Sequence, residues 1–185
     1  GAQDVVVPLT TERYRIRGYD EKDVRQDLYL TFVEREGRWG IEGDADLEDL
    51  GFMTQRNLWD LGPVHTSASE RTLIIAPERV TELGRIEDAA AEALTRVDGY
   101  WTRPWSRKVP IYVIDDPVAL ARIIQGTFPV GNYVAFSFWT GAEGEIPGAR
   151  IIVEMDADFS HDPGHLPQDG AVSMANFPSL AWWLM

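Results

Sequence analysis

The sequence predicts an α+β fold, with a β-rich N-terminal module over residues 1–61 followed by an α/β unit over residues 62–185. Two observations carry this prediction. Polar and apolar residues alternate up to about residue 60, which is the period of a half-buried strand. After the break at Gly62 and Pro63, strand-like runs alternate with helix-like segments. A hydrophobic fraction of 44% in 185 residues indicates a folded chain of one large or two small domains.

The N-terminal module is predicted to be built from hairpins. The stretch RYRIRGYD, residues 13–20, alternates and closes at a glycine turn. A second strand follows from residue 27, turns at Gly37 and resumes with Trp39 and Ile41. Its two faces carry Leu28, Leu30 and Phe32 on one side and Tyr29, Thr31 and Val33 on the other. Strands with one aromatic face must pack on a helix or a second sheet.

The second half predicts the order strand, helix, strand, helix, strand, strand. A strand TLIIA precedes a long helix over residues 77–98, which begins at Pro77 and ends at Gly99. The strand KVPIYVID is followed by a short helix with Asp116 as its N-cap and Gly126 beyond its end. The runs YVAFSFW and ARIIVEM complete the unit as strands.

Charge and composition exclude several function classes. A net charge of −13 argues against binding to nucleic acid or to an anionic membrane surface, because both need a basic face. The chain has no cysteine, which excludes thiolate chemistry, disulfides and cysteine-ligated zinc. His65 lies next to a predicted strand, and we expect it to be a partly buried hydrogen-bonding residue.

The candidate metal ligands lie in FSHDPGHLPQDG, residues 159–170. His161 and His165 have the spacing of a helical zinc pair, and Asp162 is a possible third ligand. Pro163 and Gly164 separate the two histidines and oppose the helix that would bring the imidazoles together. A surface turn is the favoured interpretation, and a loop-borne zinc site is the alternative. The acidic loop after residue 43 is not a calcium loop, because Asp49 stands where an EF-hand requires glycine.

The run VDGYWTRPWSRKVPIYVIDDPVALARIIQGTFPVGNYVAFSF resembles the front part of the peptidase MA-like domain. Further similar features are GRWGIEGDADL and WDLGPV upstream, so that the resemblance covers residues 14 to about 153. Trp101 and Trp105, which stand before a strand, belong to it. The family implies an actinobacterial envelope protein that pairs an NTF2-like or cystatin-like module with a gluzincin-type zinc peptidase domain. It also implies an extracytoplasmic location and a parent protein that can be membrane-anchored.

The resemblance ends where the zinc ligands of such peptidases would follow. The H-E-x-x-H helix of these enzymes supplies two histidine ligands and a glutamate that activates water. No histidine in this chain is followed by glutamate. The catalytic residues of the family are therefore carried over to no residue of this sequence.

Three hypotheses follow. The leading one is a non-catalytic extracytoplasmic scaffold or a peptide- or protein-binding module that acts through an exposed edge of the sheet in the second half. An open edge of this kind predicts a homodimer or poor solubility. The second is a divergent metal-dependent hydrolase that uses His161, His165 and an aspartate, and zinc is the only cofactor expected under it. The third is a small-molecule-binding NTF2-like module. Its cavity would be lined by Tyr14, Tyr29, Phe32 and Trp39, which as plain core residues would carry no such function.

Overall fold

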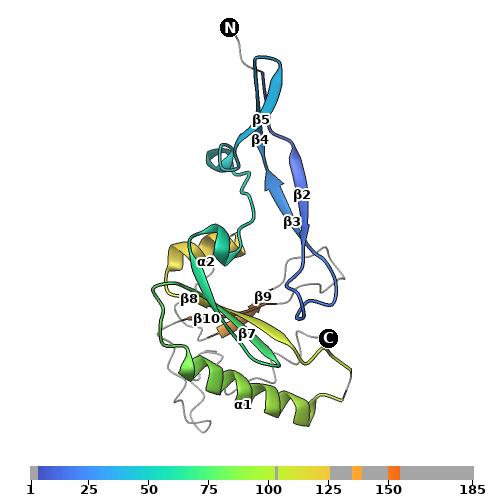
Figure 1. Cartoon of the computed structure of the whole chain (residues 1–185), viewed down its shortest axis with the longest axis vertical. Coiled ribbons are helices and arrows are strands. Elements are labelled where there is room, and N and C mark those ends of the chain that lie inside the picture. Colours follow the sequence, from blue (N-terminus) through green and yellow to red (C-terminus); the bar gives the residue numbers. More distant parts are fainter. Residues whose placement is uncertain (1–3, 103, 126–134, 139–149, 155–185) are drawn as a thin grey trace.

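The computed structural model describes residues 4–102, 104–125, 135–138 and 150–154. Within these residues the chain has the predicted α+β fold, with two α-helices, three sheets and a β-rich N-terminal part. Figure 1 shows a narrow β ribbon that projects from a wider body of sheet and helices.

The body is built on a five-stranded sheet with the order β6-β7-β8-β10-β9. The strands are β6 (Val64–Ala68), β7 (Thr72–Pro77), β8 (Val109–Ile114), β9 (Ala135–Phe138) and β10 (Arg150–Glu154). β7, β8 and β10 are parallel to one another, while β6 and β9 pair antiparallel at the two ends of the sheet. The three parallel strands are nearly continuous apolar runs because both of their faces are covered.

A helix packs on each face of this sheet. α1 (Gly84–Tyr100) covers one face, and α2 (Pro117–Ile124) covers the other together with the 3₁₀ turn η2 (Leu58–Asp60). The cluster under α1 includes Ile74, Val80, Leu83, Ile86, Ala90, Ile111, Val113, Ile151 and Val153. The cluster under α2 consists of Leu58, Ile75, Tyr112, Ile114, Leu120, Ile123 and Ile152. Leu58 therefore connects the N-terminal half of the chain to the core of the body.

The prediction that the long helix begins at Pro77 was wrong. Pro77 is the last residue of β7 and is paired with Val64, and α1 begins only at Gly84. Val80 and Leu83 show helical spacing because they are buried loop residues that pack into the same cluster as the helix. At the other end, α1 passes through Gly99 to Tyr100 and is closed by Trp101.

The short helix and the strands around it were predicted well. The Asp116 side chain accepts a hydrogen bond from the backbone N–H of Val118 (2.9 Å), and Pro117 is the first helical residue. The helix ends at Ile124, where Gln125 adopts a left-handed conformation with a φ of 52°. The predicted strands YVAFSFW and ARIIVEM are present over their described residues. Neither α-helix in the described residues is long and apolar enough to cross a membrane.

The projecting ribbon contains two small antiparallel sheets. β2 (Leu9–Tyr14) pairs with β3 (Val24–Tyr29) next to the body. Farther out, β1 (Val5–Val6), β4 (Thr31–Arg35) and β5 (Arg38–Gly43) form a three-stranded sheet in the order β1-β4-β5. We call this three-stranded sheet the arm. The predicted turn at Gly37 is confirmed, since Glu36 and Gly37 connect β4 to β5 with φ angles of 54° and 74°. These positive angles are typical of a two-residue type I′ turn.

Two details of the predicted N-terminal strands were wrong. The strand expected over residues 13–20 ends at Tyr14, and the chain then turns, with the N–H groups of Tyr19 and Asp20 bonded to the Ile16 carbonyl. The strand expected to run through Leu30 is interrupted there, so β3 and β4 belong to different sheets. Alternation of side chains continues through such a break, which is why the sequence does not reveal it.

Candidate functional site

Of the three histidines, only His65 lies within the described residues. His161, His165 and Asp162 lie outside the described residues, so the candidate metal site cannot be built from them. His65 on β6 donates from Nε2 to the Val80 carbonyl oxygen (2.5 Å), in agreement with the hydrogen-bonding role expected for it. Within the described ranges, no group of three or more histidine, aspartate or glutamate side chains is arranged to hold a metal ion.

The four aromatic residues considered as a ligand cavity lie in three separate places. The Tyr14 ring packs edge-on against Trp59, and its hydroxyl donates to Asn57. Tyr29 packs against Phe52, with ring centroids 5.5 Å apart. Phe32 and Trp39 lie on the arm, where Trp39 is 53% exposed. Trp39 is therefore neither a core residue nor part of one site with Tyr14.

A groove of about 520 Å³ lies between α1 and the turn that joins β6 to β7. Most of its lining residues are polar in type, and they include Ser67, Glu70, Arg71, Thr72, Glu87, Asp88 and Thr95. Several of these groups already have partners within the chain, since Ser67 donates to Glu87 and Arg71 pairs with Asp98. Trp105 is one of the two tryptophans that carry the family resemblance. Its side chain is half-buried beneath the Arg71 guanidinium, which lies 5.9 Å from the ring centroid.

A buried ion pair joins the N-terminal ribbon to the body. Arg150, at the start of β10, binds both carboxylate oxygens of Asp20 at 2.7 and 2.9 Å. The two side chains are only 2% and 3% exposed, and they are 130 residues apart in the sequence. The carboxylate also accepts the backbone N–H of Ile16 (2.7 Å), which fixes the turn after β2. Such a bidentate contact sets the position and orientation of both groups.

Hydrogen bonds extend this ion pair into a buried polar network. Arg150 Nε contacts the hydroxyl of Tyr112 on β8 (3.4 Å), which donates to Asn57 Oδ1 (3.2 Å). The Tyr14 hydroxyl donates to the same oxygen (2.8 Å), and the Asn57 amide donates to Gln26. The network therefore connects β2, β3, the turn η2 and two central strands of the body.

The electrostatics of the network favour a structural role. Burial raises the pKa of Tyr112 and of Tyr14, and the nearby Arg150 only partly opposes it. Burial by itself lowers the pKa of Arg150, but the hydrogen bond to Asp20 and the two tyrosines outweigh it and raise the pKa. Both phenols therefore stay protonated near neutral pH and act as hydrogen-bond donors. Neither is available as a phenolate base or nucleophile.

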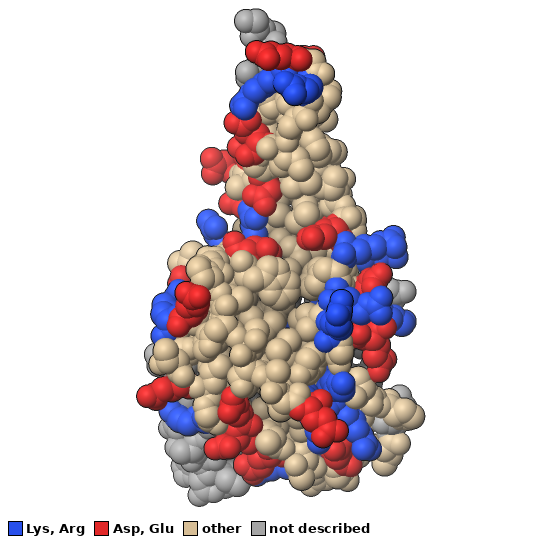
Figure 2. Space-filling view, in the orientation of Figure 1, with Lys and Arg blue, Asp and Glu red and all other residues tan. Residues whose placement is uncertain are grey.

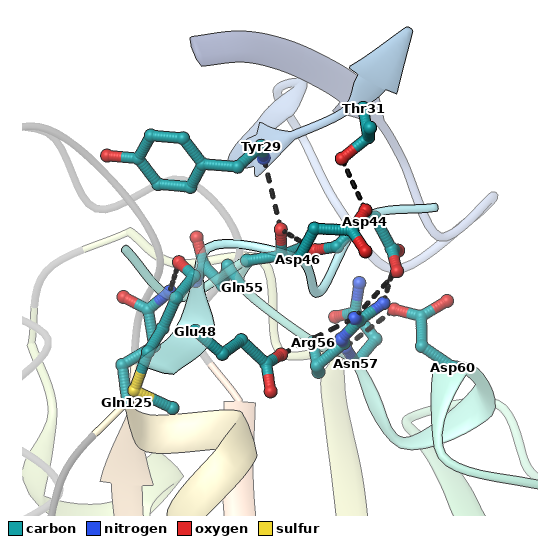
Figure 3. Close-up of polar contacts among 12 residues, drawn as sticks. Tyr29, Thr31, Asp44, Asp46, Glu48, Gln55, Arg56, Asn57, Asp60 and Gln125 are labelled. Carbon is teal, nitrogen blue, oxygen red and sulfur yellow. Dashed lines mark hydrogen bonds and ion pairs between the residues drawn. The ribbon is translucent and has the colours of Figure 1, made fainter. Parts of the chain in front are cut away.

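A second polar cluster holds the arm to the rest of the chain (Figure 3). The Arg56 guanidinium binds the Asp44 carboxylate, with one contact of 2.9 Å, and lies 3.7 Å from Glu48. Thr54 Oγ1 donates to the Asp44 carbonyl (2.6 Å) and accepts the backbone N–H of Tyr29 (3.0 Å). The acidic loop after β5 is thus folded back onto the end of β3 by internal partners, including the bond from Thr31 to Asp46.

The arm ends in an unpaired strand edge. In the described residues β5 pairs with β4 on one side and with nothing on the other. The register places Val6 opposite Phe32 and Phe32 opposite Ile41, so these residues and Trp39 share one face. On that face Ile41 is 65% exposed and Trp39 53%. Figure 2 shows uncharged surface along much of the arm in this view, with charged groups along one side and at the tip.

The sheet of the second half, on which the open edge was expected, ends at β6 and at β9, and within the described residues neither strand has a partner on its outer side. β6 carries no large exposed apolar side chain, whereas Trp39 and Ile41 on β5 are both more than half exposed. We therefore take the outer edge of β5, Arg38 to Glu42, as the candidate binding site and call it the β5 edge.

Sequence reasoning missed both the β5 edge and the Asp20–Arg150 pair. A signal for the pair was present, because Arg150 opens an apolar strand and a buried charge needs a partner. Comparison of the chain with known protein families, curated proteins and solved structures finds no match. The resemblance to peptidase MA-like domains stays a prediction.

Replacing Asp20 tests the role of the buried ion pair. Asp20→Asn removes the carboxylate that both guanidinium contacts of the buried pair require, and we expect the free energy of unfolding to fall by about 3–5 kcal/mol. Asp23→Asn is the matched control, because its ion pair with Arg15 is about half exposed and contributes below about 1 kcal/mol. Urea unfolding of both variants checks this, and equal losses would contradict it.

The cluster at the base of the arm predicts a pH dependence. The hydrogen bond from Arg56 holds the pKa of Asp44 below its ordinary value of 3.8. The stability that this pair contributes is therefore present above about pH 4 and is lost as the pH falls through the lowered pKa. Asp44 is 39% exposed, so Asp44→Asn should cost below about 1 kcal/mol at pH 7. That difference from the wild type should shrink in urea unfolding as the pH falls below about 4, with Asp49→Asn at an exposed residue as the control, and a difference that stays constant would contradict the account.

Proposed function

We propose that the chain is a non-catalytic binding module, and that the β5 edge takes up an extended strand of a protein or peptide partner. The observation that carries the proposal is the outer side of β5, which has no partner strand among the described residues and has Trp39 and Ile41 exposed along it. In such binding the main-chain groups of the edge supply hydrogen bonds, and alternate side chains supply specificity.

The composition of β5 suits such a role. Proteins protect exposed edges with lysine, proline or bulges, because an unpaired edge tends to bind other strands. The segment Arg38–Gly43 contains neither lysine nor proline. A register shift lies opposite Thr31 and Phe32, near the far end of β5. The segment from Arg38 to Ile41 is therefore regular and free to pair.

Binding a partner would remove apolar surface of the arm from water. Its apolar face is largely exposed, and a small sheet without a second layer is only marginally stable. Covering an exposed side chain such as Trp39 or Ile41 is worth about 1.5–3 kcal/mol by transfer from water. A strand added at β5 would extend the sheet and bury part of this face, which stabilises the arm and its partner together.

We further propose an extracytoplasmic location and an origin in a zinc-metallopeptidase-like protein. The resemblance over residues 14 to about 153 supports this origin, and the missing H-E-x-x-H motif supports a role other than zinc-peptidase chemistry in this chain. Under the same proposal the partner is a protein or peptide, and the net charge of −13 argues against nucleic acid.

A synthetic strand tests the proposed site. A fluorescein-labelled peptide Lys-Thr-Val-Thr-Val-Thr-Lys should gain anisotropy when the chain is titrated in. Ile41→Lys should weaken this binding about tenfold or more, because an added lysine blocks edge pairing. Val118→Lys is the matched control, since it adds the same charge at a residue that is 64% exposed, against 65% for Ile41. Equal binding by both variants would contradict the proposal.

A further inference from the structure

The sequence of β5 is complementary to a second copy of itself that runs in the opposite direction. In the segment RWGIE, Arg38 and Glu42 stand two residues on either side of Gly40, and Trp39 and Ile41 stand one residue on either side. An antiparallel pairing of two copies about Gly40 brings Trp39 opposite Ile41 of the second copy and Arg38 beside its Glu42, which is the bulged residue of β5 because Thr31 pairs with Gly43 and Phe32 with Ile41. Each of these pairs occurs twice, because the arrangement is two-fold symmetric. We propose that the β5 edge binds a second copy of this chain in this register, an inference that rests on the function proposed for that edge.

The hydrogen-bonding pattern of β5 permits this register. Arg35 and Arg38 flank the two-residue turn and so form a hydrogen-bonded pair, with the backbone groups of Arg38 directed toward β4. Backbone direction alternates along a strand, so Gly40 also faces β4, whereas Trp39 and Ile41 present their N–H and C=O groups outward. About Gly40, the outward groups of Trp39 meet those of Ile41 in the second copy. Every outward donor in this stretch then finds an acceptor.

Charge favours the register centred on Gly40 over the registers centred on the adjacent residues. Within one chain Arg38 lies opposite Arg35, which is an unfavourable like-charge pair, and Glu42 binds Arg35. Arg38 itself has no ion pair in the described residues. Glu42 of a second copy would supply the missing counter-charge. Registers centred on Trp39 or on Ile41 also satisfy the backbone, but they place Arg38 or Glu42 opposite Gly40.

The apolar face of the arm is continuous across the proposed interface. Trp39 and Ile41 lie on the face that also carries Phe32 and Val6. In the paired state, Trp39 of each copy lies beside Ile41 of the other on this face. Two three-stranded arms then form one six-stranded sheet whose apolar row crosses both copies. Aromatic and β-branched side chains make favourable cross-strand pairs.

Exchanging the charges tests the register. Arg38→Glu places two pairs of like charges across the interface, and we expect sedimentation equilibrium to show a dimer dissociation constant about tenfold higher or more. This substitution should not damage the arm, because it replaces the Arg35–Arg38 repulsion with an attraction. Glu42→Arg should weaken the dimer in the same way. The double variant Arg38→Glu with Glu42→Arg restores opposite charges and should recover the dimer.

Cross-linking tests the centre of the pairing. Residues of a non-hydrogen-bonded antiparallel pair have Cα atoms about 4.5 Å apart, which is within the range of a disulfide. A side chain at Gly40 meets no atom within 4 Å, so Gly40→Cys fits the chain. Since the protein has no cysteine of its own, mild oxidation can only join two chains. Gly40→Cys should form a covalent dimer, whereas Gly99→Cys, equally unobstructed but on α1, should stay monomeric or cross-link far more slowly.

The outcomes separate this inference from the proposed function. A wild-type chain that is monomeric at all concentrations and does not cross-link at Gly40 overturns the second copy as partner. If that monomer still binds the labelled strand peptide, the proposed edge-binding function stands. If the peptide does not bind either, both are overturned. If the Arg38→Glu variant still forms the dimer, the proposed register is contradicted. If this variant binds the peptide more tightly than the wild type does, the result supports competition between the peptide and the second copy for one edge.

Discussion

The structure depends on the ion pair between Asp20 and Arg150. Arg150 starts the interior strand β10, and Asp20 lies in the turn that follows β2, so this contact fixes where the ribbon leaves the body. A buried ion pair adds little net stability compared with apolar packing, because both charges must leave water. Its geometric requirement is strict, however, since the two parallel hydrogen bonds form only in one orientation. The pair therefore acts mainly by positioning the two parts of the chain.

The neighbouring contacts reinforce this joint. Asn57 accepts hydrogen bonds from Tyr14 of the ribbon and Tyr112 of the body, and Leu58 beside it packs in the core. The Tyr19 hydroxyl adds bonds to the Ser69 and Thr72 carbonyls of the body at the same end of the ribbon, while the far end of the ribbon projects away from the covered sheet. The arm consequently keeps an exposed apolar face and an open edge. The same arrangement that orders the base leaves the β5 edge available for pairing.

The sequence predicted those parts of the fold that have local causes. The Asp116 cap, the Gly37 turn and the apolar strands all follow from the preferences of a few adjacent residues. The start of α1 was misplaced because Val80 and Leu83 have helical spacing for a tertiary reason, namely burial in a loop. The partner of Arg150 could not be predicted, since any of the 30 acidic residues could have met it and the choice depends on contacts 130 residues apart. The edge escaped prediction because a strand gives no sign in its own sequence of whether a neighbour covers it.

Amide hydrogen exchange measured by NMR at several chain concentrations tests the binding role of the β5 edge most directly. Arg38 and Gly40 direct their N–H groups toward β4 and should be protected at every concentration. Trp39 and Ile41 direct theirs outward, so their protection should rise with chain concentration as the edge becomes paired. Fast exchange at Trp39 and Ile41 at all concentrations, with the strand peptide present or absent, would show that the edge stays unpaired and would contradict its role in binding.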